Sequence, residues 1–125
     1  MIDYVTVIYR NYDLLDLQVE NFKKRFDKKH YNLIVVDNTP DSEKRALPET
    51  EDYQYVYCNS SPTFDGLSHG RAIDYGLTFC KTGIVSIIDS DYFVLNNNIH
   101  YYIIDKFEQG YKAVGTEYND GKDTS

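Results

Sequence analysis

Two aspartates separated by one residue, Asp89 and Asp91, close an apolar run that begins at Ile84. The run is rich in β-branched side chains and follows Thr82-Gly83, a pattern typical of a buried strand. In an open α/β sheet, ligands bind just beyond the carboxyl ends of strands, so both carboxylates are expected at the mouth of a site. Such carboxylates repel one another unless a cation lies between them, and hard oxygen ligands suit Mn²⁺ or Mg²⁺. The alternative is an acidic turn without such a role, because Asp-Ser-Asp is also ordinary turn chemistry.

Four other segments have the composition of strands. Residues 4–9, 32–37, 53–58 and 111–116 are short and rich in Val, Ile and Tyr. The segment 32–37 ends at Asp37, so an apolar strand that ends in an aspartate occurs twice in the chain. Between 38 and 52 the composition turns to Pro, Asp, Ser and Glu, which predicts a loop with a short helical turn.

Three helices are expected between these strands. Leu15, Val19, Phe22 and Phe26 recur at spacings of four, three and four, which predicts one apolar stripe on a helix ending near Lys28. Residues 68–81 form a second helix, with Ser68 as its cap and Gly83 as its stop. Its two glycines, at positions 70 and 76, each weaken a helix by about 1 kcal/mol relative to alanine, so close backbone approach is their expected reason. The third helix spans 98–109 and is ended by the glycine at position 110.

Strands that alternate with helices predict a three-layer α/β fold: a mostly parallel sheet with helices on both faces. At 125 residues the chain is expected to be one domain over 1–125, with 117–125 as a frayed polar tail. Right-handed crossovers place the ends of the first, second and fourth strands on a common edge. The residues expected to converge there are Tyr12, Asp37, Asn38, Asp89 and Asp91.

The ordered set of motifs resembles the nucleotide-sugar-binding half of a glycosyltransferase of the GT-A fold, family 2 type. That family opens with a strand followed by Pro-Thr-Tyr-Asn, continues with a strand ending in Asp-Asp or Asp-Asn, and later carries a strand ending in Asp-x-Asp. Here the matching stretches are Arg10-Asn11-Tyr12-Asp13, Asp37-Asn38-Thr39 and Asp89-Ser90-Asp91. The resemblance covers residues 4–116. The departures are Arg10-Asn11 in place of Pro-Thr, and Asn38 as the second residue of the Asp-Asn pair.

The resemblance implies a UDP- or GDP-sugar as the partner and a divalent cation as the cofactor. Arg10 and Tyr12 would border the nucleobase, and Asp37 and Asn38 would contact base or ribose. Asp89 would hold the ribose and, together with Asp91, the cation that bridges the two phosphates. In glycosyltransferases of this family the acceptor platform and the general base follow the fifth strand, so this chain is expected to be a truncated donor half.

Two residues at the start of the second helix are further candidates. His69 and Arg71 would add positive charge near the phosphates, where helix N–H groups already point. For His69 the alternative is a capping or buried imidazole.

The composition excludes several classes of function. With a net charge of −7 the chain repels a phosphate backbone, and the basic residues at 23–25 and 28–30 suit the end of a helix, so nucleic acid is not an expected partner. No apolar run approaches the roughly 20 residues of a membrane span. Cys58 and Cys80 are too few for a disulfide framework or a zinc site, which favours free thiols and a cytoplasmic protein.

Two other functions compete with the one that the resemblance implies. A non-catalytic module of the same fold would use its sheet edge or tyrosine-rich surface to self-associate, as a homo-oligomer, or to bind a partner protein. A phosphotransferase with Asp37 as nucleophile is disfavoured, because Thr39 stands where that chemistry needs a second aspartate.

Overall fold

The structure, a computed structural model, describes residues 1–58 and 66–115. The predicted tail 117–125 lies outside these residues. Helices are labelled α, short 3-10 helices η and strands β. The elements in chain order are β1 (Ile2–Ile8), α1 (Tyr12–Arg25), η1 (Lys28–His30), β2 (Tyr31–Asp37), η2 (Asp41–Glu43), β3 (Gln54–Tyr57), α2 (Gly66–Leu77), β4 (Val85–Ile88) and α3 (Asn98–Glu108).

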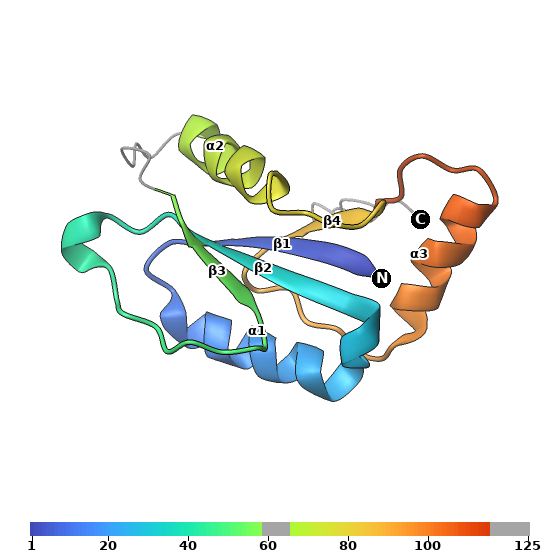
Figure 1. Cartoon of the computed structure of the whole chain (residues 1–125), viewed down its shortest axis with the longest axis horizontal. Coiled ribbons are helices and arrows are strands. Elements are labelled where there is room, and N and C mark those ends of the chain that lie inside the picture. Colours follow the sequence, from blue (N-terminus) through green and yellow to red (C-terminus); the bar gives the residue numbers. More distant parts are fainter. Residues whose placement is uncertain (59–65, 116–125) are drawn as a thin grey trace, which may run out of the picture.

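The four strands form one parallel sheet in the order β3-β2-β1-β4. The central strand β1 pairs on both sides, with Val5 opposite Ile34 of β2 and Ile87 of β4. Figure 1 shows α1 and α2 on opposite faces of this sheet, while α3 lies beside the end where the chain begins. The predicted three-layer α/β fold is confirmed.

The predicted apolar stripe of α1 is the centre of the larger core. All four stripe residues are buried: Leu15, Val19, Phe22 and Phe26. The ring of Tyr4, from β1, meets Phe22 edge-on with centroids 5.1 Å apart and stacks on Phe26 at 5.6 Å. Aromatic pairs in these arrangements add about 0.5–1.5 kcal/mol beyond the area they bury, so they fix the height of α1 above the sheet.

The opposite face of the sheet depends on one glycine of α2. A Cβ atom at Gly76 would lie 2.7 Å from side-chain methyl carbons of both Val5 and Val36. The helix backbone therefore rests directly on two β-branched side chains. The expectation of close approach is confirmed at Gly76 and is wrong at Gly70, where a Cβ would meet nothing within 4 Å.

The predicted ends of α2 differ from the observed ones. The helix begins at Gly66, so Ser68 lies inside it and is not its cap. It ends at Leu77 rather than at Lys81, because the N–H groups of residues 78–80 bond to carbonyls three residues back, which closes the helix with a tighter turn. Gly83 is therefore not the helix stop.

The helix α3 confirms the third predicted helix, and the predicted fifth strand that follows it does not form. Gly110 has φ +97°, and the N–H groups of Gly110 and Tyr111 bond to the carbonyls of Phe107 and Lys106, the pattern of a Schellman motif. Residues 111–115 then form no strand, and Tyr111 and Val114 are exposed. The β-like composition is not enough, because a strand forms only where its backbone pairs with a neighbour. Residues 111–115 make no such pairing, although Val114 and Gly115 line the same hollow as residues 86–89 of β4 and the turn after it.

None of the helices in the described ranges has the length and hydropathy that a bilayer crossing requires.

A buried carboxylate ties the connection before β4 to the start of β1. Asp3 Oδ2 accepts hydrogen bonds from the backbone N–H of Lys81 at 2.8 Å and from the N–H and hydroxyl of Thr82 at 2.7 and 2.8 Å. Its Oδ1 accepts from Asn32 Nδ2 at 3.1 Å. Burial by itself raises the pKa of Asp3, but the hydrogen bonds from Thr82, Asn32 and Lys81 outweigh it and lower the pKa below its ordinary value.

The glycine contact predicts opposite effects at two positions of one helix. Replacing Gly76→Ala forces a methyl group into Val5 and Val36 and should lower the free energy of unfolding by about 1–3 kcal/mol, the usual cost of overpacking. Replacing Gly70→Ala adds the same methyl group in open space and should raise it by about 0.5–1 kcal/mol through helix propensity. Urea unfolding of both variants measures the difference, and equal shifts would contradict the packing described for α2.

The Asp3 network predicts a specific acid sensitivity. Because the folded pKa lies below the unfolded value of about 3.9, the stabilisation is complete above that pH and is lost as the pH falls further. Replacing Asp3→Asn should lower the free energy of unfolding at pH 7 by about 1–3 kcal/mol and should flatten its decline below pH 4. Replacing the exposed Asp74→Asn is the control, which should keep the acid decline of the unmodified protein. An unchanged acid limb in Asp3→Asn would contradict this account.

Candidate functional site

The strand order places a topological switch point between β1 and β4. From β1 the chain moves outward to β2 and β3, and it then returns to β4 on the other side of β1. The crossover from β1 to β2 and the crossover from β3 to β4 therefore run in opposite directions along the sheet. In open α/β sheets ligands bind beyond the carboxyl ends of the strands where the strand order reverses in this way.

The acidic turn, residues 89–92, lies at this switch point directly after β4. Asp89 and Asp91 are exposed, and neither carboxylate has a hydrogen bond or ion pair among the described residues. The Tyr92 N–H bonds to the Asp89 carbonyl at 3.0 Å and closes the turn. Ser90 Oγ accepts a hydrogen bond from Asn11 Nδ2 at 2.6 Å, so the acidic turn is tied to the segment that follows β1.

The segment after β1 is held in an unusual backbone conformation. Arg10 has φ +66°, a region that costs a residue with a side chain about 1 kcal/mol or more. Its N–H donates to Thr39 Oγ1 at 2.9 Å, and its guanidinium pairs with Glu43 and lies 4.8 Å from the centre of the Tyr9 ring. Asn11 completes the turn by accepting from the Tyr9 N–H at 2.8 Å. The β1 and β2 ends are thus fastened to each other as well as to the acidic turn.

Asp37 lies at the end of β2 and is fully buried, with 0% exposure. Its Oδ2 accepts hydrogen bonds from the hydroxyls of Tyr12 and Tyr55, both at 2.7 Å, and its Oδ1 accepts from the Thr39 N–H at 3.0 Å. Burial, the hydrogen bond to Asp37 and its negative charge raise the pKa of Tyr55, so that hydroxyl stays a proton donor. Contact between Asp37 and a nucleobase stays a prediction, and it requires a tyrosine hydroxyl to leave the carboxylate.

Asn38 connects the end of β2 to α2. It is buried, and its Nδ2 donates to Ser68 Oγ at 3.0 Å. Its own N–H bonds to the Ile8 carbonyl at 2.9 Å, which continues the β1–β2 ladder past the sheet. Ser68, the expected cap, therefore takes part in joining α2 to the site edge.

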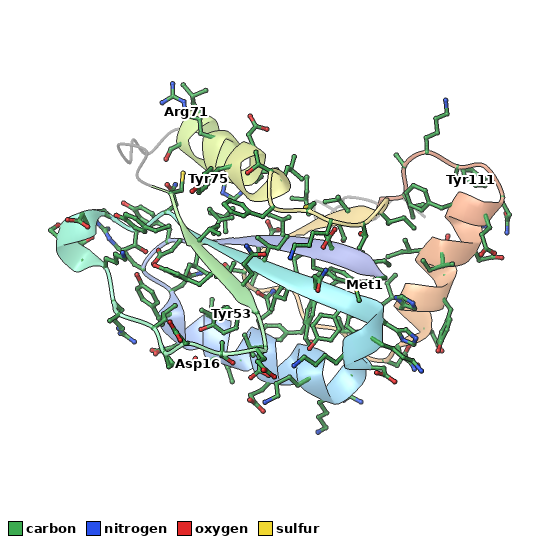
Figure 2. All side chains as sticks on the ribbon, viewed as in Figure 1. Met1, Asp16, Tyr53, Arg71, Tyr75 and Tyr111 are labelled. Atoms are coloured by element: carbon green, nitrogen blue, oxygen red, sulfur yellow. The ribbon has the colours of Figure 1, made fainter. Side chains whose placement is uncertain are left out.

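The two predicted cations of α2 are exposed. His69 is not the buried imidazole that was one of its two alternatives. Figure 2 shows Arg71 on the outer side of α2, pointing away from the sheet. A role for either residue at a phosphate stays a prediction.

Two basic residues that sequence reasoning missed lie closer to the strand ends. Lys44 Nζ lies 4.1 Å from the centre of the Tyr57 ring, and the Arg45 guanidinium lies 5.1 Å from that of Tyr12. The Arg45 N–H also donates to the Tyr12 hydroxyl at 3.1 Å. No periodicity marks such loop residues, although a cation in a loop between two tyrosine-rich segments is a composition that favours cation–π contacts.

Tyr55 was not among the predicted site residues, although the register of the strands could have identified it. In a strand that alternates, residues 55 and 57 share one face, and the carboxyl end of β3 lies beside that of β2. A tyrosine hydroxyl near a buried carboxylate follows from that register.

The residues of the acidic turn suit a hard divalent cation only in part. Asp89, Ser90 and Asp91 offer oxygen donors, the ligand type that Mg²⁺ and Mn²⁺ prefer. Across the described ranges, however, no cluster of three or more His, Cys, Asp or Glu side chains could enclose a metal. Mg²⁺ is commonly bound by one or two carboxylates together with substrate phosphates and water, and this donor set fits that arrangement.

Cys58 is buried and Cys80 is half-buried, and burial raises the pKa of the Cys80 thiol.

Comparisons with known proteins identify the fold. No family model and no curated protein sequence matches this chain. Among solved structures, that of the glycosyltransferase TarS from S. aureus matches with a TM-score of 0.62 and 13% sequence identity. The match covers 86% of this chain and 19% of that protein, so the chain spans about a fifth of its length. The chain therefore has a glycosyltransferase-like α/β fold.

Proposed function

We propose that this chain binds a nucleotide-diphosphate sugar, as the donor-binding part of a metal-dependent glycosyltransferase of the GT-A, family 2 type. One observation carries the proposal. The acidic turn follows β4 at the switch point of a glycosyltransferase-like fold, and its two carboxylates are exposed and uncommitted among the described residues.

Asp89 and Asp91 would hold a divalent cation, Mn²⁺ or Mg²⁺, whose remaining ligands come from the diphosphate and water. When bound, the cation neutralises the charge that develops on the leaving diphosphate. Asp89 would also accept a hydrogen bond from a ribose hydroxyl, as the family resemblance implies. The chain's own part is to fix the two carboxylates at one point of the sheet edge, through the Asn11–Ser90 hydrogen bond.

The nucleoside would lie over the ends of β1 and β2. Arg10 is exposed at that edge, whereas Tyr12 and Asn38 are buried beneath it, and Asp37 accepts a hydrogen bond from the Tyr12 hydroxyl. The amide of Asn38 both donates and accepts, so it would suit either uracil or guanine once its hydrogen bond to Ser68 Oγ is released. Lys44 and Arg45 add positive charge on the same edge, which supports binding of an anionic ligand in a chain of net charge −7.

The proposal predicts that cation and nucleotide bind together. UDP-sugars and GDP-sugars should bind in the presence of Mn²⁺, and Mn²⁺ alone should bind weakly, because two carboxylates do not enclose it. Replacing Asp91→Ala should weaken nucleotide binding by about 10- to 100-fold, the usual loss when a metal site is damaged. Calorimetric titration measures all three. Replacing the exposed Asp74→Asn is the matched control and should leave binding unchanged. Binding without Mn²⁺, or no binding of either donor class, would remove the proposal.

A second candidate function rests on the outer edge of β4. In the described part of the chain β4 pairs only with β1, and Val85 and Ile87 are 38% and 56% exposed on one face. An exposed edge with apolar side chains favours pairing with another strand. A non-catalytic module would use this edge to assemble with a second copy of the chain.

The assembly function makes its own prediction. The unmodified chain should sediment as a dimer, and replacing Ile87→Lys should convert it to a monomer, because a lysine on an edge strand opposes pairing. Replacing Leu17→Lys on the exposed side of α1 should leave the dimer intact. A monomer at micromolar concentrations would exclude the assembly function and leave the donor-binding proposal untouched.

A further inference from the structure

One buried amide of α1 holds the acidic turn. Gln18 is 0% exposed, and its Nε2 donates to the carbonyls of Asp89 and Tyr92, both at 3.0 Å. The orientation of this amide follows from chemistry, because a flipped Gln18 would place its oxygen against two carbonyl oxygens. One side chain therefore clamps both ends of the turn that carries Asp89 and Asp91.

Core stability does not account for a glutamine at this position. Gln18 Oε1 is buried and has no hydrogen-bond partner among the described residues. A buried acceptor without a partner costs about 1–3 kcal/mol, which offsets part of what the two hydrogen bonds of Nε2 contribute. A hydrocarbon side chain of similar volume would avoid that cost but would leave the carbonyls of Asp89 and Tyr92 without this donor. The polar side chain is therefore explained by the turn that it holds.

We propose that Gln18 is a positioning residue of the donor site. Its two hydrogen bonds fix the backbone from Asp89 to Tyr92, so that both carboxylates leave the turn at the switch point. Because the clamp acts on backbone carbonyls, it leaves the carboxylate oxygens free for a ligand. This inference rests on the proposed function, since it concerns the same site.

Asn21, one helical turn further along α1, provides the contrast. Its Nδ2 donates to the Val94 carbonyl at 2.8 Å, and its Oδ1 accepts from the Val94 N–H at 2.6 Å. Both ends of this amide are satisfied, and Val94 lies beyond the acidic turn. Asn21 is thus the matched structural clamp, which holds the chain between β4 and α3 without touching the turn.

The test compares Gln18→Met and Gln18→Leu with Asn21→Leu in the full chain. Three quantities are measured: the free energy of unfolding, the affinity for UDP and GDP in the presence of Mn²⁺, and the rate of amide hydrogen exchange at Ser90 and Asp91. The two Gln18 variants should lose stability, because the carbonyls of Asp89 and Tyr92 lose their donor. After correction for the folded fraction, they should still bind the nucleotide about 10- to 100-fold more weakly, with faster exchange at both amides. Asn21→Leu should lose stability and keep its nucleotide affinity once corrected for the folded fraction.

Three results would overturn the inference. If Asp91→Ala loses binding but both Gln18 variants bind like the unmodified protein, the inference fails and the donor site stands. If exchange at Ser90 and Asp91 does not change, or if binding falls only in step with stability as in Asn21→Leu, the role of Gln18 is structural. If Asp91→Ala also binds normally, the proposed function fails and takes the inference with it.

Discussion

The central strand β1 imposes the constraint on which the rest of the structure depends. It is paired on both edges, covered on both faces, and buried at every position except the half-buried Val7. Burial of a polar group without a partner is costly, and β1 already carries two such oxygens among the described residues, Tyr4 Oη and Thr6 Oγ1. Further polar chemistry is therefore best accommodated where the strand ends. Its carboxyl end, between β2 and β4, is also the point where the strand order reverses, so the sheet order and the burial of β1 select the same place.

Two buried aspartates show how this constraint is met at the two ends of the sheet. At the amino end, Asp3 accepts four hydrogen bonds, three of them from the segment before β4, so this carboxylate joins that segment to β1. At the carboxyl end, Asp37 accepts three hydrogen bonds, two of them from tyrosines of α1 and β3. Tyrosine hydroxyls can rotate away from a carboxylate, whereas the backbone groups around Asp3 cannot. The carboxyl end is therefore the more adaptable of the two.

Patterns within a few residues predicted the elements, and contacts between elements decided the rest. The stripe of Leu15, Val19 and Phe22 predicted α1, and the apolar runs predicted four strands, because burial repeats with the period of the element. The fifth strand was wrong because a strand exists only with a partner, and residues 111–115 pair with none although Val114 and Gly115 lie near β4. The ends of α2 were also wrong, since Ser68 is used by Asn38 rather than by the helix end.

The same distinction applies to the candidate site: some of its residues could be predicted from the sequence, and others only from the packing. The spacing of Asp89 and Asp91 after an apolar run was visible in the sequence, and right-handed crossovers were enough to predict that the ends of β1, β2 and β4 share an edge. The residues that support this edge were not visible. Gln18 falls in a stretch of helix where polar residues are normally exposed, and only the packing of α1 against the segment after β4 reveals that it is buried.

The acidic turn combines exposed carboxylates with a buried support, and the two properties depend on each other. Two adjacent carboxylates are least costly when hydrated, so Asp89 and Asp91 must stay at the surface. An exposed turn of four residues would otherwise fluctuate. Hydrogen bonds from Gln18 to two backbone carbonyls and from Asn11 to a serine hydroxyl restrain the turn without using a carboxylate oxygen. Rigidity is thus supplied from α1 and the end of β1, and the charge remains available at the sheet edge.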